Sequence, residues 1–107
     1  MASFVIIKSN DKNYKLEYNR SSIVRMEENG FDVQKMNEKP LSTIVLLMRG
    51  AFYMHNPSLT DEEIDAICEQ ITNSEELVKQ LVEMYMKALN SLVGDKKQEK
   101  NFKWEKN

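Results

Sequence analysis

The sequence has few of the residues that usually build disulfide, metal or phosphate sites. It contains one cysteine, one histidine and three glycines. One cysteine excludes an internal disulfide framework, and one histidine leaves too few ligands for a typical zinc site. Three isolated glycines form no phosphate-binding loop. We therefore expect no metal and no cofactor.

Long apolar runs are also missing. No run approaches the roughly 20 residues that cross a bilayer, and the N-terminus lacks the basic start and long apolar stretch of a secretory signal. The low cysteine content fits a reducing compartment. These features predict a soluble protein of the cytoplasm that does not associate with membranes.

The chain has no large excess of charge of one sign. It carries 15 basic and 17 acidic residues, a formal net charge of -2. This balance argues against a protein that binds nucleic acid through bulk charge. Apolar residues make up 41% and charged residues 30%, which suffices for a small core. A length of 107 residues has room for one domain.

The candidate catalytic groups lack partners in the sequence. Cys68 lies on an apolar stripe, where a free cysteine usually acts as a small hydrophobic residue. His55 has no second histidine to work with, so we expect a role at a helix end. Residues 58–64 resemble the entry helix of a calcium-binding hand, but no loop of oxygen ligands follows. We therefore expect that the protein is not an enzyme.

The N-terminal residues have the pattern of a β-hairpin. An apolar run at residues 4–7 and an alternating run at residues 14–18 flank turn-forming residues. The alternation places three side chains on one face: Tyr14, Leu16 and Tyr18. A lone hairpin is marginally stable in water, so we expect this face to pack on helices.

A short helix is expected after the hairpin. Asn19 is a suitable N-cap, and Gly30 suits the left-handed position that follows a helix. Ile23 and Met26 give this helix a narrow apolar stripe. Residues 31–39 are expected to be extended at first and then irregular.

Three further helices are expected. One opens at Pro40, runs to about Met54 and is apolar over most of its circumference. The next begins at a capping box formed by Thr60 and Glu63, and the last carries apolar residues through 77–92. The predicted fold is therefore α+β, an N-terminal β-hairpin packed on a small bundle of about four helices.

Residues 95–107 differ from the rest of the chain. They hold five lysines and three acidic residues and show no apolar periodicity. This composition predicts a flexible, disordered basic tail after a single α+β domain of residues 1–94. Phe102 and Trp104 in the tail are candidate anchors for a partner or stacking groups for nucleic acid. A solvated tail with incidental aromatic residues is an equally good interpretation.

The helices at 41–54 and 77–93 carry more apolar surface than a domain of this size easily buries. Methionines lie on both, and methionine suits surfaces that accept varied apolar partners, although it also fills gaps in cores. A surplus of this kind marks a surface for a client or for self-association. Our candidate partner-binding residues are Leu47, Met48, Phe52, Met54, Val82, Met86, Phe102 and Trp104.

Several short motifs, in order along nearly the whole chain, resemble one family. They are Tyr18-Asn19-Arg20, Met26-Glu27, Gly30-Phe31-Asp32, Gly50-Ala51-Phe52 with His55, Leu81-Val82-Glu83-Met84-Tyr85, Leu89-Asn90-Ser91-Leu92 and Lys103-Trp104-Glu105. Together they are similar to small tail-assembly chaperones of long-tailed phages and prophages of Gram-positive bacteria. Arg49 and the Tyr53-Met54 pair depart from the family pattern, in which other apolar or histidine residues are common there.

The resemblance implies a protein encoded between the tail-tube and tape-measure proteins, with both as partners, in the cytoplasm of the bacterial host. Such chaperones coat the tape measure, keep it soluble, help recruit tube subunits and are absent from the finished virion. In many relatives a ribosomal frameshift near the end of the reading frame makes a longer form. Lys96-Lys97 is compatible with a slippery site of that kind.

Two other function classes stay open. A generic protein-interaction adaptor of phage or prophage origin would show the same apolar surplus, and the neighbouring genes would distinguish it from a chaperone. A nucleic-acid-binding regulator is disfavoured by the net charge and by the lack of a basic recognition helix. Salt-sensitive binding to DNA would favour that third class.

The tail prediction can be tested by truncation. A chain that ends at Gly94 should fold with an unchanged thermal midpoint, because residues without apolar periodicity contribute little to the core. A drop of more than about 5 °C, equivalent to roughly 1 kcal/mol for a domain of this size, would mean that Phe102 or Trp104 is docked on the fold.

Overall fold

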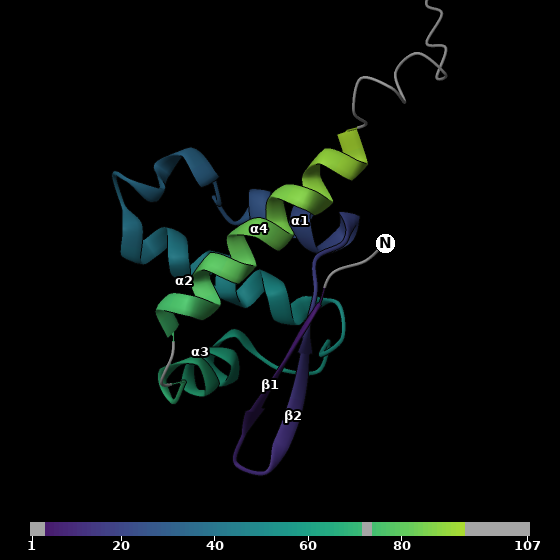
Figure 1. Ribbon diagram of the computed structural model, residues 1–107, viewed down its shortest axis with the longest axis vertical. Coiled ribbons are helices and arrows are strands. Elements are labelled where there is room, and N and C mark those ends of the chain that lie inside the picture. Colours follow the sequence, from purple (N-terminus) through teal and green to yellow (C-terminus); the bar gives the residue numbers. More distant parts are fainter. Residues whose placement is uncertain (1–3, 72–73, 94–107) are drawn as a thin grey trace, which may run out of the picture.

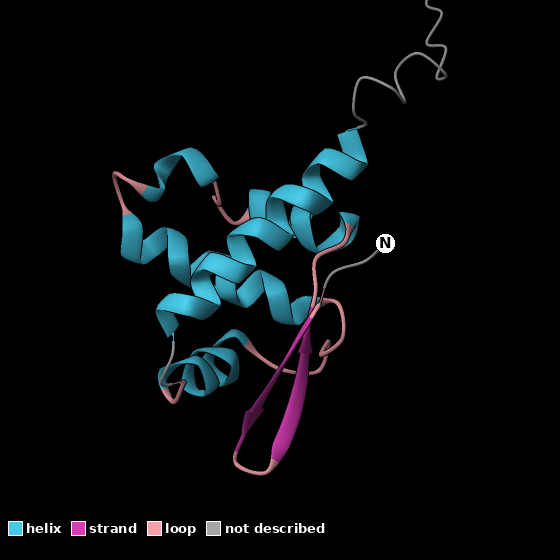
Figure 2. Cartoon of the chain, viewed as in Figure 1, coloured by secondary structure: helices cyan, strands magenta, loops and turns pink. Residues whose placement is uncertain are grey.

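The computed structural model describes residues 4–71 and 74–93. Its fold is α+β, as predicted: a two-stranded antiparallel hairpin precedes four α-helices (Figures 1 and 2). The elements are β1 (Val5–Ser9), β2 (Lys12–Leu16), α1 (Arg20–Glu28), a 3-10 helix η1 (Val33–Met36), α2 (Pro40–Tyr53), α3 (Asp61–Glu69) and α4 (Ser74–Val93). No helix in the described part of the chain is long and apolar enough to span a bilayer.

The hairpin turns through two residues, Asn10 and Asp11, which both have positive φ (51° and 66°). This is the type I′ geometry that matches the twist of the strands, and Asn and Asp tolerate it well. The predicted apolar face is confirmed. Leu16 and Tyr18 are buried, and the half-buried Tyr14 ring lies 5.9 Å from the ring of Phe52 on α2.

The caps of α1 are those that the sequence predicts. The Asn19 side chain accepts from the Ser22 backbone N–H, and Gly30 adopts φ +99° just beyond the helix. Ile23 and Met26 are buried at 3% and 1% exposure. Local chemistry at the two ends therefore sets the length of this helix.

The segment after α1 differs from the prediction. Residues 33–36 form η1 rather than irregular structure, because the Asp32 carboxylate accepts from the Gln34 N–H at 3.0 Å and closes a turn. Phe31, just before it, is buried and meets Tyr85 of α4 edge-on at 5.0 Å. The turn thus directs Phe31 into the core.

Helix α2 lies at the centre of the fold. Pro40 occupies its first turn, as predicted, and the helix contacts β2, η1, α1, α3 and α4. Leu47, Ala51 and Phe52 have 0% exposure. The hydroxyl of Tyr18 donates to the Leu47 carbonyl oxygen at 2.7 Å, and burial raises the pKa of Tyr18 well above its usual value.

The last two helices begin as expected where the structure describes them. The Thr60 hydroxyl accepts from the Glu63 N–H at 3.1 Å, and the Glu63 carboxylate accepts from the Thr60 N–H at 2.8 Å. The predicted capping box of α3 is therefore confirmed. The predicted cap of α4 at residues 72–74 falls largely outside the described residues. Gly94, the tail, Phe102 and Trp104 lie wholly outside them.

The contact between α1 and α2 depends on a missing side chain. A Cβ added to Gly50 would overlap the Sδ and Cγ atoms of Met26, whose side chain is itself 1% exposed and has little room to move. Gly50 therefore permits the close approach of the two helices at this point.

We expect Gly50→Ala to lower the free energy of unfolding by about 1–2 kcal/mol. Overpacking costs about 1–3 kcal/mol, and the gain of up to about 1 kcal/mol in helix propensity offsets only part of it. Urea denaturation measures the change. In a Met26→Ala background the same substitution should cost nothing, and an equal cost in both backgrounds would contradict the steric explanation.

Candidate partner-binding surface

Three of the eight candidate partner-binding residues lie in the core. Leu47 and Phe52 have 0% exposure and Met48 has 7%. The surrounding elements use the apolar surplus of α2 within the fold, so these three residues cannot contact a partner from the folded state. The prediction that α2 presents a broad apolar surface is wrong for this face.

Three other candidates reach the surface. Met54, at the C-terminal end of α2, and Met86, on α4, are each 37% exposed, and Val82 is half-buried on α4. Phe102 and Trp104 lie outside the described residues. The candidate surface therefore centres on α4.

Helix α4 carries two apolar stripes. One faces the core and consists of Leu77, Leu81, Met84, Tyr85 and Ala88. The other is formed by four residues at spacings of four, three and four, which we call the outer stripe: Val82, Met86, Leu89 and Val93. A 4-3-4 spacing aligns side chains along one line of a helix.

The outer stripe is most exposed at the end of α4. Val82 and Leu89 are half-buried, Met86 is 37% exposed and Val93 is 66% exposed. The C-terminal part of α4 also projects past the neighbouring helices in Figure 1. Val82 and Leu89 also pack against the core, so Met86 and Val93 are the exposed members of the line. A partly exposed apolar line of about three helical turns is the kind of surface that a second helix fits.

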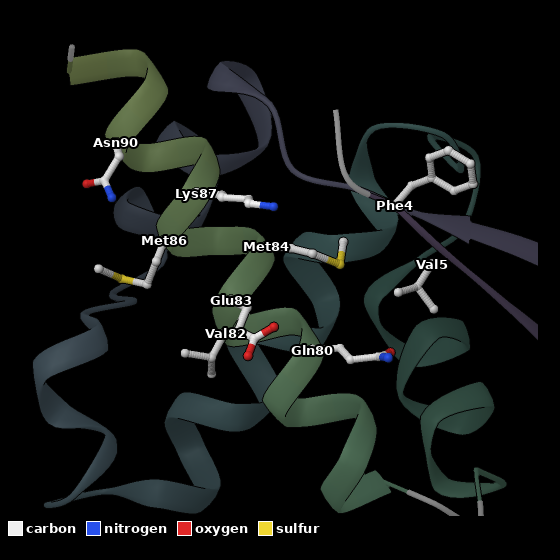
Figure 3. Close-up of a pocket in the computed structure, with 9 residues that line it drawn as sticks. All are labelled: Phe4, Val5, Gln80, Val82, Glu83, Met84, Met86, Lys87 and Asn90. Carbon is white, nitrogen blue, oxygen red and sulfur yellow. The ribbon is translucent and has the colours of Figure 1, made fainter. Parts of the chain in front are cut away.

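A groove of about 550 Å³ runs between α4 and the start of β1. Figure 3 shows that Gln80, Met84 and Lys87 point from α4 toward Phe4 and Val5, whereas Val82 and Met86 project from the opposite flank of α4. Val82 and Met86 also line the groove, so the groove and the exposed apolar residues of α4 share part of one surface. The sequence pattern includes Phe4 in an apolar run but does not reveal its position beside α4.

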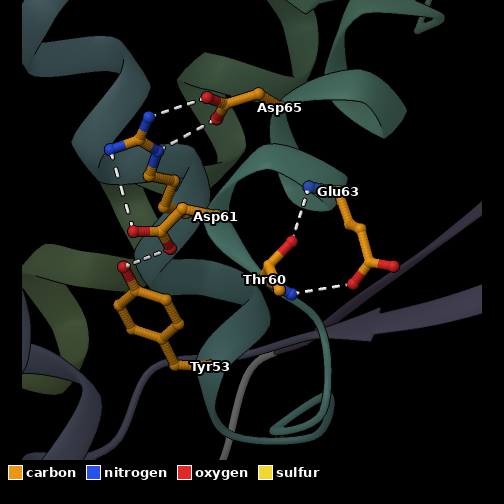
Figure 4. Close-up of polar contacts among 6 residues, drawn as sticks. Tyr53, Thr60, Asp61, Glu63 and Asp65 are labelled. Atoms are coloured by element: carbon orange, nitrogen blue, oxygen red, sulfur yellow. Dashed lines mark hydrogen bonds and ion pairs between the residues drawn. The ribbon is translucent and has the colours of Figure 1, made fainter.

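A network of polar side chains joins α2 to α3 (Figure 4). Arg49 donates to both carboxylate oxygens of Asp65, at 3.0 and 2.7 Å, and its third nitrogen lies 3.9 Å from Asp61. The Tyr53 hydroxyl donates to Asp61 at 3.1 Å, and the Arg25 guanidinium lies over the Tyr53 ring at 3.8 Å. These hydrogen bonds lower the pKa of Asp65 and raise that of Arg49. Arg49 contacts both carboxylates of α3, so the network braces two helices.

His55 has a partner that the sequence does not reveal. Its Nε2 lies 2.7 Å from Oε1 of Glu17, a residue that is 8% exposed and lies 38 positions earlier. The pair connects the end of β2 to the end of α2, which agrees with the predicted role of His55 at a helix end. Among the residues that the structure describes, no three His, Cys, Asp or Glu side chains lie close enough to hold a metal ion.

One comparison with known proteins gives a match. The family model described as "Domain of unknown function (DUF5055)" matches residues 1–107. The chain belongs to this family. Comparison of this DUF5055 chain with curated proteins and with solved structures gives no match.

Cys68 is half-buried on the core-facing side of α3. Burial raises the pKa of its thiol to about 11, and the nearby Asp65 carboxylate adds to the shift. A thiol with a raised pKa is a poor nucleophile at neutral pH. The environment is therefore that of a packing residue.

Cys68 should react slowly with a thiol reagent at pH 8. A pKa of about 11 instead of 9.0 lowers the thiolate fraction about 100-fold, and partial burial slows access further. The protection is measured as the rate of iodoacetamide labelling of the folded protein, compared with the rate for the protein unfolded in concentrated urea. Labelling at the unfolded-state rate would contradict the packing role.

Proposed function

We propose that this protein is a phage tail-assembly chaperone that binds the tape-measure protein, keeps it soluble and helps recruit tail-tube subunits. In this proposal it acts in the cytoplasm of the bacterial host and does not remain in the virion. The observation that carries the proposal is the outer stripe of α4. It offers partly exposed apolar surface with methionine, on a chain whose motifs resemble that chaperone family along nearly its whole length.

The chemistry of the outer stripe suits a holding function. Val82, Leu89 and Val93 provide fixed apolar shape, and the flexible Met86 side chain adapts to different apolar neighbours. A tape measure is long and rich in helices, so it presents many apolar helix faces in succession. Each contact can be weak, because several copies on one client bind with high combined affinity.

The proposal also fits the polar groups described above. Arg49 and Asp65 bind each other, and the Cys68 thiol has a raised pKa. These arrangements stabilise packing and leave α4 as the surface for a client. The mechanism therefore consists of reversible, non-covalent coverage of apolar segments.

Met86→Asp should weaken client binding without unfolding the domain. A carboxylate at the centre of the outer stripe would lose its hydration at the contact and gain no partner. Co-expression with the tape-measure protein encoded beside it, followed by pull-down and a solubility assay, measures the effect. We expect recovery of the client to fall at least about tenfold, the effect of roughly 1.4 kcal/mol.

Leu41→Asp is the matched control. Leu41 is 75% exposed at the start of α2, so the substitution makes a similar change from an apolar to an acidic side chain on another helix. The free energy of unfolding of both variants should lie within about 0.5 kcal/mol of the wild-type value. Only Met86→Asp should release the client. If the tape measure stays insoluble and unbound at low and high salt, even with the frameshifted form supplied, the adaptor alternative replaces the chaperone.

A further inference from the structure

The two outer edges of the hairpin differ in the hydrogen bonds that they receive from the rest of the fold. The outer edge of β2 is covered: the Glu17 N–H donates to the Ala51 carbonyl at 3.0 Å, and the Asn56 side-chain amide donates to the Lys15 carbonyl at 3.1 Å. These contacts come from α2 and the loop after it. The outer edge of β1 receives no such hydrogen bond from any residue that the structure describes.

The turn determines which groups of β1 face outward. In a two-residue hairpin the flanking pair, here Ser9 and Lys12, exchanges hydrogen bonds, and such pairs then alternate along the strands. Ile7 and Val5 therefore bond to β2. The N–H and C=O groups of Ile6 and Lys8, and those of Phe4 just before the strand, face the free edge.

This free edge is also apolar. Ile6 is 57% exposed and Phe4 is 51% exposed, and Phe4 also lines the groove beside α4. Natural proteins usually protect edge strands with charge, proline or a bulge, because an exposed apolar edge recruits other strands. β1 has only Lys8 for this purpose, so its composition favours a partner strand.

We propose that β1 pairs with β1 of a second copy, antiparallel, about a two-fold axis at Ile6. The register follows from the outward groups. With Ile6 opposite Ile6 of the second copy, Phe4 lies opposite Lys8, and the outward N–H and C=O groups of all three residues find partners. The strand is thus complementary to itself, as a two-fold interface requires.

The charges agree with this register. Each Lys8 lies across from an aromatic ring instead of another lysine, so like charges do not face each other. The same kind of contact already exists within one chain, because Lys15 Nζ lies 4.3 Å from the centre of the Phe4 ring. The two copies of Ile6 then cover each other at the axis.

The groove of Figure 3 provides room at this end of β1. It is lined by Phe4 and Val5 on one side and by α4 on the other, with no residue of β2 in its lining. The end of the second copy's strand, with Lys8, would enter beside Glu83 and Lys87 of α4. Val82 and Met86 also line this groove, so a paired strand would lie close to the proposed client site.

Cysteine cross-linking in a Cys68→Ala background tests the register. In the proposed pair the two Cα atoms of residue 6 lie about 5.5 Å apart, within the range that a disulfide spans. The two Cα atoms of residue 8 lie about 14 Å apart, since each faces residue 4 of the other copy. Ile6→Cys should therefore form a cross-linked dimer on mild oxidation, and Lys8→Cys should not. Equal cross-linking of both variants, or of neither, would overturn the proposal.

Sedimentation of the full chain at rising concentration tests the interface itself. Ile6→Pro removes the outward N–H and leaves the bonds within the hairpin, and Ile6→Lys places like charges across the axis. Both should weaken dimerisation at least about tenfold, whereas Ile6→Thr, which keeps the N–H and strand propensity, should retain it. Circular dichroism controls for folding. A monomeric wild type, or a dimer that both variants retain, would refute the pairing, and the client pull-down would stay informative in either case.

Discussion

The enclosure of α2 is the constraint on which the rest of the structure depends. This helix contacts β2, η1 and the other three helices, so its apolar residues form the centre of the core. The absence of a side chain at Gly50 lets α1 approach closely, and the Arg49–Asp65 pair fixes α3. The apolar faces that the surrounding elements turn toward α2 are buried against it. A partner can therefore contact only the outward faces of those elements.

Much of the fold could be predicted because its signals are local. The turn-forming residues after the first strand, the N-cap Asn19, the glycine after α1 and the capping box at Thr60 all act within a few residues. Each favours one backbone conformation whatever surrounds it. The α+β class follows from their order. The bounds of the second strand were less accurate, since β2 begins at Lys12 and the predicted run at residue 14. The η1 turn was missed because one side chain, Asp32, decides it.

The candidate site could be predicted only in part, because exposure depends on tertiary packing. Periodicity marks Phe52 and Met86 equally as apolar helix residues, yet one has 0% exposure and the other 37%. The Glu17–His55 pair joins positions 38 residues apart, and the cover over β2 comes from Ala51 and Asn56. Such long-range contacts leave no periodic pattern in one sequence.

The two uncovered surfaces have a joint consequence. Val82 and Met86 line the same groove as Phe4, so paired β1 strands would lie close to this part of the outer stripe (Figure 3). Leu89 and Val93 do not line the groove, and a dimer would carry two copies of this end of the stripe at a fixed separation. Once one stripe binds a long client, the second meets the next segment at an effective concentration in the millimolar range. Weak contacts at each stripe then suffice for stable coverage, and each contact still dissociates quickly enough to be displaced during assembly.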